Sequence, residues 1–354
     1  MVRLKDVAEK AGVSVMTISK ALRNASDISS ATKARIKILA EQMGYVPDSA
    51  AQNLRNRTSK LFGLVIPSVT NPLFARMVSA IEERTRELGY DLILAQTLNL
   101  PEREDASVRR LLSRRVDGLF ISPVYRPVQS VPIYEELKRR ATPTIILGHC
   151  GLFCDQFANV ESDDIKGSHA ATSHLIQLGH KRIAFLGGPP GSPWAQERFE
   201  GYRRALRDAL IEFDDSLVFT AGSTIDEGEK TALLLINEST EITAVQAVND
   251  LVAIGAANVF LNQGFKIPQE LSVVGFGNIL ASEYFRVPLT TLRQPKHRMG
   301  DAAVDCMLQL LSGQLPESRR LAADLVIRAS TSAPQMAQRS TKIQHRNLEP
   351  QVAL

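Results

Sequence analysis

The sequence predicts an α/β protein in which a small helical unit precedes a larger body of two doubly wound lobes. Up to about residue 60, apolar residues recur at the three- and four-residue spacing of amphipathic helices. From residue 61 onward, short apolar runs such as FGLVI (62–66) and LSVVGF (271–276) alternate with amphipathic helical stretches. Buried apolar strands that alternate with helices are typical of parallel sheets.

The distribution of charged residues also changes near residue 60. Of the 42 Lys and Arg residues, eleven lie in the first 60 positions beside five Asp and Glu, whereas the whole chain of 354 residues has a net charge of only +4. A basic module attached to a slightly acidic body favours a polyanionic partner for the first 60 residues alone. An apolar content of 44% is sufficient for the cores of two or three domains.

The stretch LKDVAEKAGVSVMTISKAL (4–22) predicts two short helices joined at Gly12. Gly12 can adopt the positive φ of a tight turn, and Ser14 can cap the second helix. Two helices joined by such a turn form a helix-turn-helix unit. We expect its second helix, about residues 15–23, to lie in the major groove of DNA.

A third helix is predicted to begin at Ser29 or Ser30 and to end at Gly44. Pro47 and Asp48 then mark a boundary, and residues 48–60 form a basic linker with a short candidate helix that is marginal on its own. The core face of the third helix and the two residues that close the three-helix core are expected to be Ile36, Leu39, Met43, Tyr45 and Val46.

The body of the chain is expected to form two α/β lobes. The first comprises about residues 61–158 plus 291–320, and the second about 159–290 plus 321–334. Ligands of such sheets bind beyond the C-terminal ends of the strands, so a cleft between the lobes is the expected site. The polar residues 335–354 are expected to be a disordered tail. The remaining predicted strands lie in DLILA (91–95), VDGLFIS (116–122), TIILG (144–148), RIAFLGG (182–188) and TAVQAV (243–248).

Several classes of protein are disfavoured by what the sequence lacks. Three cysteines (Cys150, Cys154 and Cys306) without a Cys-x-x-Cys pair indicate neither a disulfide framework nor a metal site. No arrangement of nucleophile and base is recognisable, so we expect neither enzymatic activity nor a cofactor. No apolar segment of about twenty residues is present, so we expect a cytoplasmic protein that makes no membrane contact.

The motifs DVAEKAGVSVMTISKALRN (6–24) and YVPDSAAQNL (45–54) resemble the lactose-repressor/galactose-repressor (LacI/GalR) family of bacterial transcription regulators. The likeness extends from about Val2 to about Ser332. It implies a helix-turn-helix DNA-binding domain at 1–47 and a hinge helix at 48–60. It also implies a periplasmic-binding-protein-like core at 61–334, which binds an effector and dimerises.

The resemblance assigns base-reading positions to Val15, Met16 and Lys20. Lys20 can donate to guanine, whereas Val15 and Met16 can make only apolar contacts, for example with a thymine methyl group. The resemblance also implies that Leu54 of the hinge wedges into the minor groove, and Arg55 adds positive charge beside it. The residues expected to contact phosphates are Thr17, Ser19 and Asn24.

For the effector, the resemblance implies six contact residues, and Asn278 is a seventh candidate that could compensate for a lost one. Phe74 is a candidate platform for a ring, and Arg198 with amide and carboxylate partners can hold hydroxyl groups or a carboxylate. For each polar residue the alternative that it only caps a helix or faces solvent stays open. The polar contact residues are Asn71, Asp163, Arg198, Asn249, Asp250 and Asn278.

Two positions depart from the family pattern. Gly277 stands where a ligand-binding aspartate is usual, and Ser223 and Thr224 replace an expected aromatic residue. Both changes remove features that suit sugar recognition, and Asn278 or Trp194 are the candidates to compensate. The effector is therefore an unusual sugar, another metabolite, or absent.

The function expected from this resemblance is a repressor that binds a near-palindromic operator as a homodimer, with an affinity that a small molecule modulates. Three alternatives stay open. The first is an activator of the same architecture, because whether the bound protein activates or represses depends on where the operator lies. A solute-binding protein would need another use for the basic N-terminal helices, and an enzyme on the same lobes would turn over its ligand.

Overall fold

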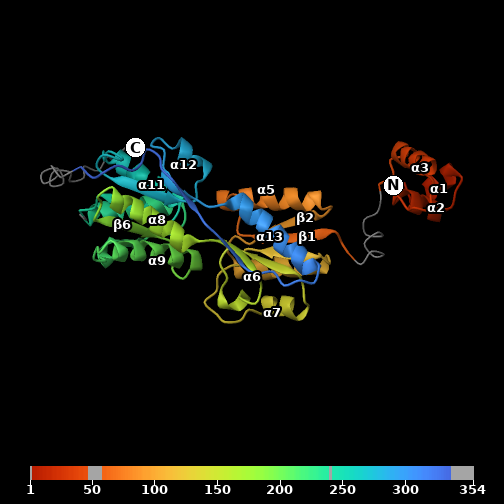
Figure 1. Cartoon of the computed structure of the whole chain (residues 1–354), viewed down its shortest axis with the longest axis horizontal. Helices are drawn as coiled ribbons and strands as arrows, with labels where there is room; N and C mark the ends of the chain where they lie inside the picture. Colours follow the sequence, from red (N-terminus) through yellow and green to blue (C-terminus); the bar gives the residue numbers. More distant parts are fainter. Residues whose placement is uncertain (1, 47–57, 239–240, 336–354) are drawn as a thin grey trace, which may run out of the picture. The chain divides into compact units, whose positions relative to one another are not determined.

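The computed structural model describes residues 2–46, 58–238 and 241–335. The chain forms two compact units, residues 1–59 and 60–354, and each is described by itself. Figure 1 shows helical structure in the first unit and both helices and strands in the second. Most of the predicted hinge, including Leu54 and Arg55, and nearly all of the predicted tail lie outside the described residues.

The N-terminal unit is the predicted three-helix bundle. Its helices are α1 (Leu4–Ala11), α2 (Val15–Leu22) and α3 (Ser30–Gln42). Gly12 has φ +68° after α1, and the side chains of Ser14 and Ser29 cap α2 and α3. Tyr45 packs on the core as predicted, but Val46 is 74% exposed, so the prediction that it closes the core is wrong. The buried core consists of Val7, Ala8, Ile18, Ala21, Ile36 and Ala40.

The first sheet of the larger unit contains six parallel strands in the order β11-β5-β4-β3-β1-β2. Alternate residues of its strands face opposite sides, so Leu64 packs under α5 and α13 whereas Val65 packs under α6 and α7. Its strands are β1 (Leu61–Ile66), β2 (Asp91–Gln96), β3 (Gly118–Ile121), β4 (Thr144–Leu147), β5 (Asn159–Ser162) and β11 (Arg319–Leu321). The helices are α5 (Pro72–Glu87), α6 (Pro101–Ser113), α7 (Pro132–Arg139) and α13 (Lys296–Leu311).

The second sheet has the order β12-β10-β9-β8-β6-β7, and only β12 is antiparallel to its neighbour. Helices α10 and α11 cover one face, and α8 and α9 cover the other. Its strands are β6 (Ile183–Gly187), β7 (Val218–Thr220), β8 (Ala244–Ala247), β9 (Ser272–Phe276), β10 (Thr290–Arg293) and β12 (Asp324–Val326). The helices are α8 (Asp164–Gln177), α9 (Pro193–Asp208), α10 (Ile225–Asn237), α11 (Asp250–Asn262) and α12 (Leu280–Tyr284).

The chain passes between the two lobes three times, a few residues later than predicted. Residues 159–162 form β5 of the first sheet because Val160 pairs with Leu147 and Arg319. Residues 290–293 form β10 of the second sheet, beside β9. The crossings therefore lie at residue 163, at 294–295 and at 322–323, instead of at 158, 290 and 320.

A buried histidine ties the second sheet to the C-terminal described segment. Both ring nitrogens of His180 are engaged: Nδ1 lies 2.9 Å from Thr243 Oγ1, and Nε2 lies 3.1 Å from Ser272 Oγ and 2.9 Å from the carbonyl oxygen of Ser332. Burial lowers the pKa of His180, with an opposing contribution from the Ser332 hydrogen bond. The folded unit therefore holds the imidazole in its neutral form.

This geometry makes the stability of the larger unit depend on pH. Because the pKa of His180 is lower in the folded chain, acid below about pH 6.5 protonates the unfolded chain first and the free energy of unfolding falls. We expect His180→Gln to cost about 2 kcal/mol at pH 7.5 and to flatten this fall. Urea titrations at several pH values test it, with the exposed His297→Gln as control. An unchanged slope for His180→Gln would contradict the assignment.

Candidate DNA-binding and effector sites

Helix α2 presents apolar side chains to solvent on the face opposite its core contacts. Ile18 and Ala21 are fully buried, whereas Val15 is 45% and Met16 57% exposed. The helix starts here because Ser14 Oγ accepts the backbone N–H of Thr17 at 3.1 Å. Exposed apolar side chains in the first turn of a capped helix suit contact with the edges of bases.

The predicted guanine donor, Lys20, is ion-paired in this structure. Its Nζ lies 2.5 Å from the carboxylate of Asp27, in the loop that follows α2. The hydrogen bond from Lys20 lowers the pKa of Asp27 and so keeps the carboxylate ionised. Asn24 is exposed in the same loop, with φ +59°, and Thr17 and Ser19 are half-buried on α2. The Lys20 ammonium has three N–H donors, so it can contact DNA beside Asp27 or after release from it.

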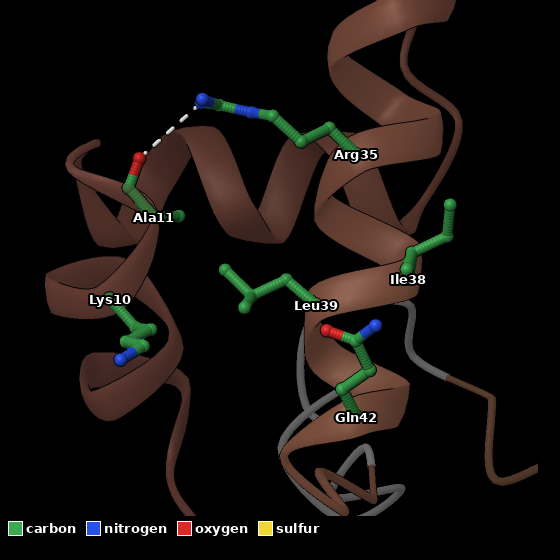
Figure 2. Close-up of a pocket in the computed structure, with 6 residues that line it drawn as sticks. All are labelled: Lys10, Ala11, Arg35, Ile38, Leu39 and Gln42. Atoms are coloured by element: carbon green, nitrogen blue, oxygen red, sulfur yellow. Dashed lines mark hydrogen bonds between the residues drawn. The ribbon is translucent and has the colours of Figure 1, made fainter.

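A shallow cavity of about 310 Å³ lies elsewhere on this unit, between α1 and α3. Figure 2 shows Arg35 at its edge, where the guanidinium donates to the carbonyl of Ala11 at 3.3 Å. No residue predicted to contact DNA lines this cavity, so it is separate from the exposed start of α2. It is lined by Lys10, Ala11, Arg35, Ile38, Leu39 and Gln42.

Three of the predicted effector residues cap helices in the larger unit. Asn71 Oδ1 accepts the N–H of Leu73 at the start of α5, and Asn249 Oδ1 accepts the N–H of Val252 in α11. Asp163 Oδ1 accepts the N–H of Lys166 in α8. Two of the three have further partners: Oδ2 of Asp163 lies 3.1 Å from Lys166 Nζ, and Nδ2 of Asn249 donates to the carbonyl of Ser223 at 3.1 Å.

Phe74 occupies the core of the first lobe rather than an open surface. Its ring is 9% exposed and packs in the cluster that α5 and α13 form under the first sheet. A ring platform needs one accessible face, so Phe74 offers little to a ligand in this arrangement. Its role as a platform stays a prediction.

Arg198 is the most highly connected of the predicted effector residues. Its Nε and Nη2 lie 2.9 and 2.8 Å from the Asp164 carboxylate, and its Nη1 donates to the carbonyl of Val248 at 2.7 Å. The guanidinium lies 3.8 Å from the ring centre of Phe276 and 4.9 Å from that of Trp194. Nε and Nη2 both bond the same oxygen, Oδ2 of Asp164. Arg198 is only 5% exposed and Asp164 only 1%, so this is a buried ion pair.

Asp250 and Asn278 lie beside this pair at the ends of β8 and β9. Asp250 is buried and accepts hydrogen bonds from Thr291 Oγ1 at 2.5 Å and from the N–H of Ile279 at 2.8 Å. Burial raises the pKa of Asp250, although Lys296 and Arg198 act in the opposite direction. The side chain of Asn278, at φ +49°, accepts a hydrogen bond from Arg328. Through its hydrogen bond with the N–H of Ile279, Asp250 holds the loop after β9 in place.

A group of charged side chains connects the two lobes where the strands end. We call His149, Glu161, Glu197 and Arg320 the junction cluster. His149 lies 3.2 Å from Glu161 of its own lobe and 3.1 Å from Glu197 of the second lobe, to which Arg320 also donates. Burial opposes protonation of His149, but the surrounding carboxylates outweigh it and raise its pKa. The cluster thus bonds α9 of the second lobe to β4, β5 and β11 of the first.

Sequence reasoning did not find the junction cluster, Asp164 or Lys296 as site residues. The sequence analysis named Asp163 as an effector contact and left the carboxylate partner of Arg198 unnamed, whereas Arg198 bonds the adjacent Asp164. Glu197 was adjacent to a predicted residue and was still missed, because its partner His149 is 48 positions away.

The two departures from the family pattern have local structural explanations. Thr224 caps α10 in a capping box with Glu227, so the loop after β7 is a helix start without an aromatic side chain. Gly277 has φ +135°, a conformation that residues with a side chain rarely adopt. Trp194 and Phe276 are the aromatic residues that contact Arg198.

Two classes of feature are missing from the described ranges. Residues 2–46, 58–238 and 241–335 contain no group of three or more His, Cys, Asp or Glu side chains arranged to hold a metal ion. Within the same ranges, no helix has both the length and the apolar character that crossing a membrane requires.

Comparisons with known proteins agree on one family. Residues 3–48 match the family profile of bacterial regulatory proteins, lacI family, and residues 172–331 match that of the periplasmic binding protein-like domain. The HTH-type transcriptional repressor PurR of Vibrio atlanticus (strain LGP32) is 31% identical over 319 residues, which cover 90% of this chain and 95% of the relative. The repressor CytR of Escherichia coli (strain K12) is 30% identical and covers 93% and 96%.

Solved structures give the same result. The crystal structure of the lac repressor dimer bound to operator and the anti-inducer ONPF superposes with a TM-score of 0.83 at 29% identity, covering 94% of this chain and 99% of that one. The complex of the transcriptional regulator CelR with cellobiose has a TM-score of 0.69 at 28% identity and covers 93% and 100%.

The Lys20–Asp27 pair predicts that Asp27 restrains DNA binding. Asp27→Asn removes one negative charge and releases Lys20, so we expect affinity for double-stranded DNA to rise about 3- to 10-fold and the logarithmic salt dependence to steepen by about one. Fluorescence anisotropy across a salt series measures both quantities. The control is Glu41→Gln, which makes the same change of charge at a position away from Lys20. Binding by Asp27→Asn no tighter than by the control would refute the prediction.

The Arg198–Asp164 pair predicts a large stability effect. Arg198→Met leaves the Asp164 carboxylate buried without its cation, so we expect a loss of about 3 kcal/mol in the free energy of unfolding. Urea unfolding followed by fluorescence of Trp194, the single tryptophan, measures it. The exposed Arg207→Met should change stability by less than about 0.5 kcal/mol. Similar values for both variants would show that the pair contributes little.

Proposed function

Since the chain belongs to the lacI family of bacterial regulatory proteins, we propose that it is a DNA-binding transcriptional repressor whose affinity for its operator is modulated by a small sugar or related metabolite. The relatives PurR and CytR are transcriptional repressors. Repression follows when bound protein occupies the operator. The chain acts in the bacterial cytoplasm, where DNA is accessible, and it has no enzymatic activity.

The observation that carries this proposal is the exposed first turn of α2. Val15 and Met16 face solvent while Ile18 and Ala21 of the same helix fill the core, so the helix is fixed in orientation and free on its outer face. A capped helix of this kind reads the major groove with its N-terminal residues. Thr17, Ser19, Lys20 and Asn24 add polar groups for phosphates and bases.

The protein acts as a homodimer on a near-palindromic operator. The lac repressor, which this chain resembles over 94% of its length, is a dimer on its operator. A two-fold dimer places its two recognition helices about one turn of DNA, or a multiple, apart. Leu54 and Arg55, outside the described residues, then contribute a minor-groove wedge and a basic neighbour.

The effector binds where the strands of both lobes end. This region contains the Arg198–Asp164 pair, Asp250 and Asn278, and the junction cluster adds contacts that span the lobes. A ligand that bonds both lobes favours one lobe arrangement over another. It can change DNA affinity only to the extent that it binds the two arrangements differently.

Substitution of the outer face of α2 tests the proposed reading of DNA. Replacement of both Val15 and Met16 by threonine reduces the apolar contact area and adds hydroxyl groups that can bond base edges, so we expect the selected operator sequence to change at one or two positions in each half-site. We also expect about 10-fold weaker binding to the original operator. Selection from a random library, followed by sequencing, measures the preference.

The control substitution is Ile38→Thr, which changes an equally exposed apolar residue in the cavity between α1 and α3. It should select the same sequence as the unmodified protein. If the double variant selects the same sequence as the unmodified protein, this face does not read bases. If the unmodified protein selects no sequence at all, the proposed function is wrong.

A further inference from the structure

Lys296 is a buried cation at the second crossing between the lobes. It begins α13, directly after residues 294–295, and it is only 6% exposed. Its Nζ donates to the carbonyl of Asn278 at 3.2 Å, so it connects a helix of the first lobe with the loop after β9 in the second. Neither the prediction from sequence nor the proposed function uses this residue.

The Lys296 ammonium is incompletely satisfied. It has three N–H donors, and only the Asn278 carbonyl accepts one among the residues that the structure describes. None of the ion pairs within these residues includes Lys296. Buried charges are normally paired because an unpaired charge loses its hydration without compensation. Burial accordingly lowers the pKa of Lys296 to about 8.

The neighbouring charges do not supply the missing partner. Asp250 of α11 favours the charged amine, but its carboxylate accepts from Thr291 and Ile279, and no ion pair joins it to Lys296 among the described residues. Arg76 of α5 is a second cation that acts on Lys296. Gly277, next to the Asn278 contact, has no side chain that could reach the amine. The site therefore presents positive charge and open donor capacity at the point where both lobes meet.

We propose that Lys296 is an anion-binding residue of the effector site, and that the effector carries a carboxylate or phosphate group. This inference rests on the proposed function of the lobe junction. A sugar acid or a sugar phosphate has the required chemistry, since its anionic group pairs with Lys296 while its hydroxyl groups reach the polar side chains near Arg198. The bound anion then contacts the Lys296 ammonium, which lies where the two lobes meet.

The test compares each anion with its neutral parent. Melting temperatures of the full chain are measured with inorganic phosphate, and with a panel of sugar acids, sugar phosphates and the corresponding neutral sugars at equal ionic strength. We expect one anionic class to raise the melting temperature by about 4 °C or more at 100 times its Kd, while its neutral parent has no effect. Carboxylates and phosphates are tested separately, so the class that raises the melting temperature identifies the anionic group of the effector.

Variants assign the response to the residue. Lys296→Met keeps the length of the side chain and removes the charge, so the shift should be lost, whereas Lys296→Arg should retain it. Lys181→Met, which changes an exposed lysine, should behave like the unmodified protein. The shift should also weaken from pH 7 to pH 9.5 in the unmodified protein, as the amine loses its proton beside Asp250 and Arg76, but not in Lys296→Arg.

The outcomes separate this inference from the proposed function. Equal shifts with neutral parents, an anion response that persists in Lys296→Met, or no shift with any anion would each overturn the assignment of Lys296. In that case Lys296 only ties the lobes together, and its replacement lowers the melting temperature without altering the ligand response. Operator binding, measured in parallel on the same preparations, reports on the proposed function independently.

Discussion

The buried ion pair between Arg198 and Asp164 is the interaction on which the larger unit depends. One guanidinium joins α8 to α9, reaches the end of β8 through the Val248 carbonyl, and lies on the ring of Phe276 in β9. Because water reaches neither charge, each depends on the other for compensation. The pair thereby fixes the helix that carries Glu197, and the junction cluster transmits this position to the first lobe.

Features set by neighbouring residues were predictable from the sequence. The turn at Gly12 and the caps at Ser14 and Asn71 follow from backbone geometry within three or four positions, and the structure contains all three. The alternation of apolar runs and helices likewise gave both sheets. Val46 failed because its exposure is set by the arrangement of three helices and not by its own apolar character.

Features set by distant residues were not predictable. The partner of Arg198 could be either of two adjacent aspartates, and only the packing of α8 against α9 selects Asp164. Lys296 follows a proline at a helix start, a position that suits an exposed lysine equally well, and its burial results from the approach of the loop at Asn278. The lobe boundaries shifted because a four-residue strand such as β5 is too short to show a period.

The three crossings between the lobes govern how such a gene can be recombined. Each lobe is assembled from separate segments of the chain, because β5, β10 and β11 each precede a passage to the other lobe. A single genetic exchange therefore cannot replace one lobe and keep the other. The N-terminal helices contribute no strand to either sheet and form one contiguous stretch, so one exchange can replace them completely. Operator choice can thus be inherited separately from effector choice, whereas the two lobes that make the effector site are inherited together.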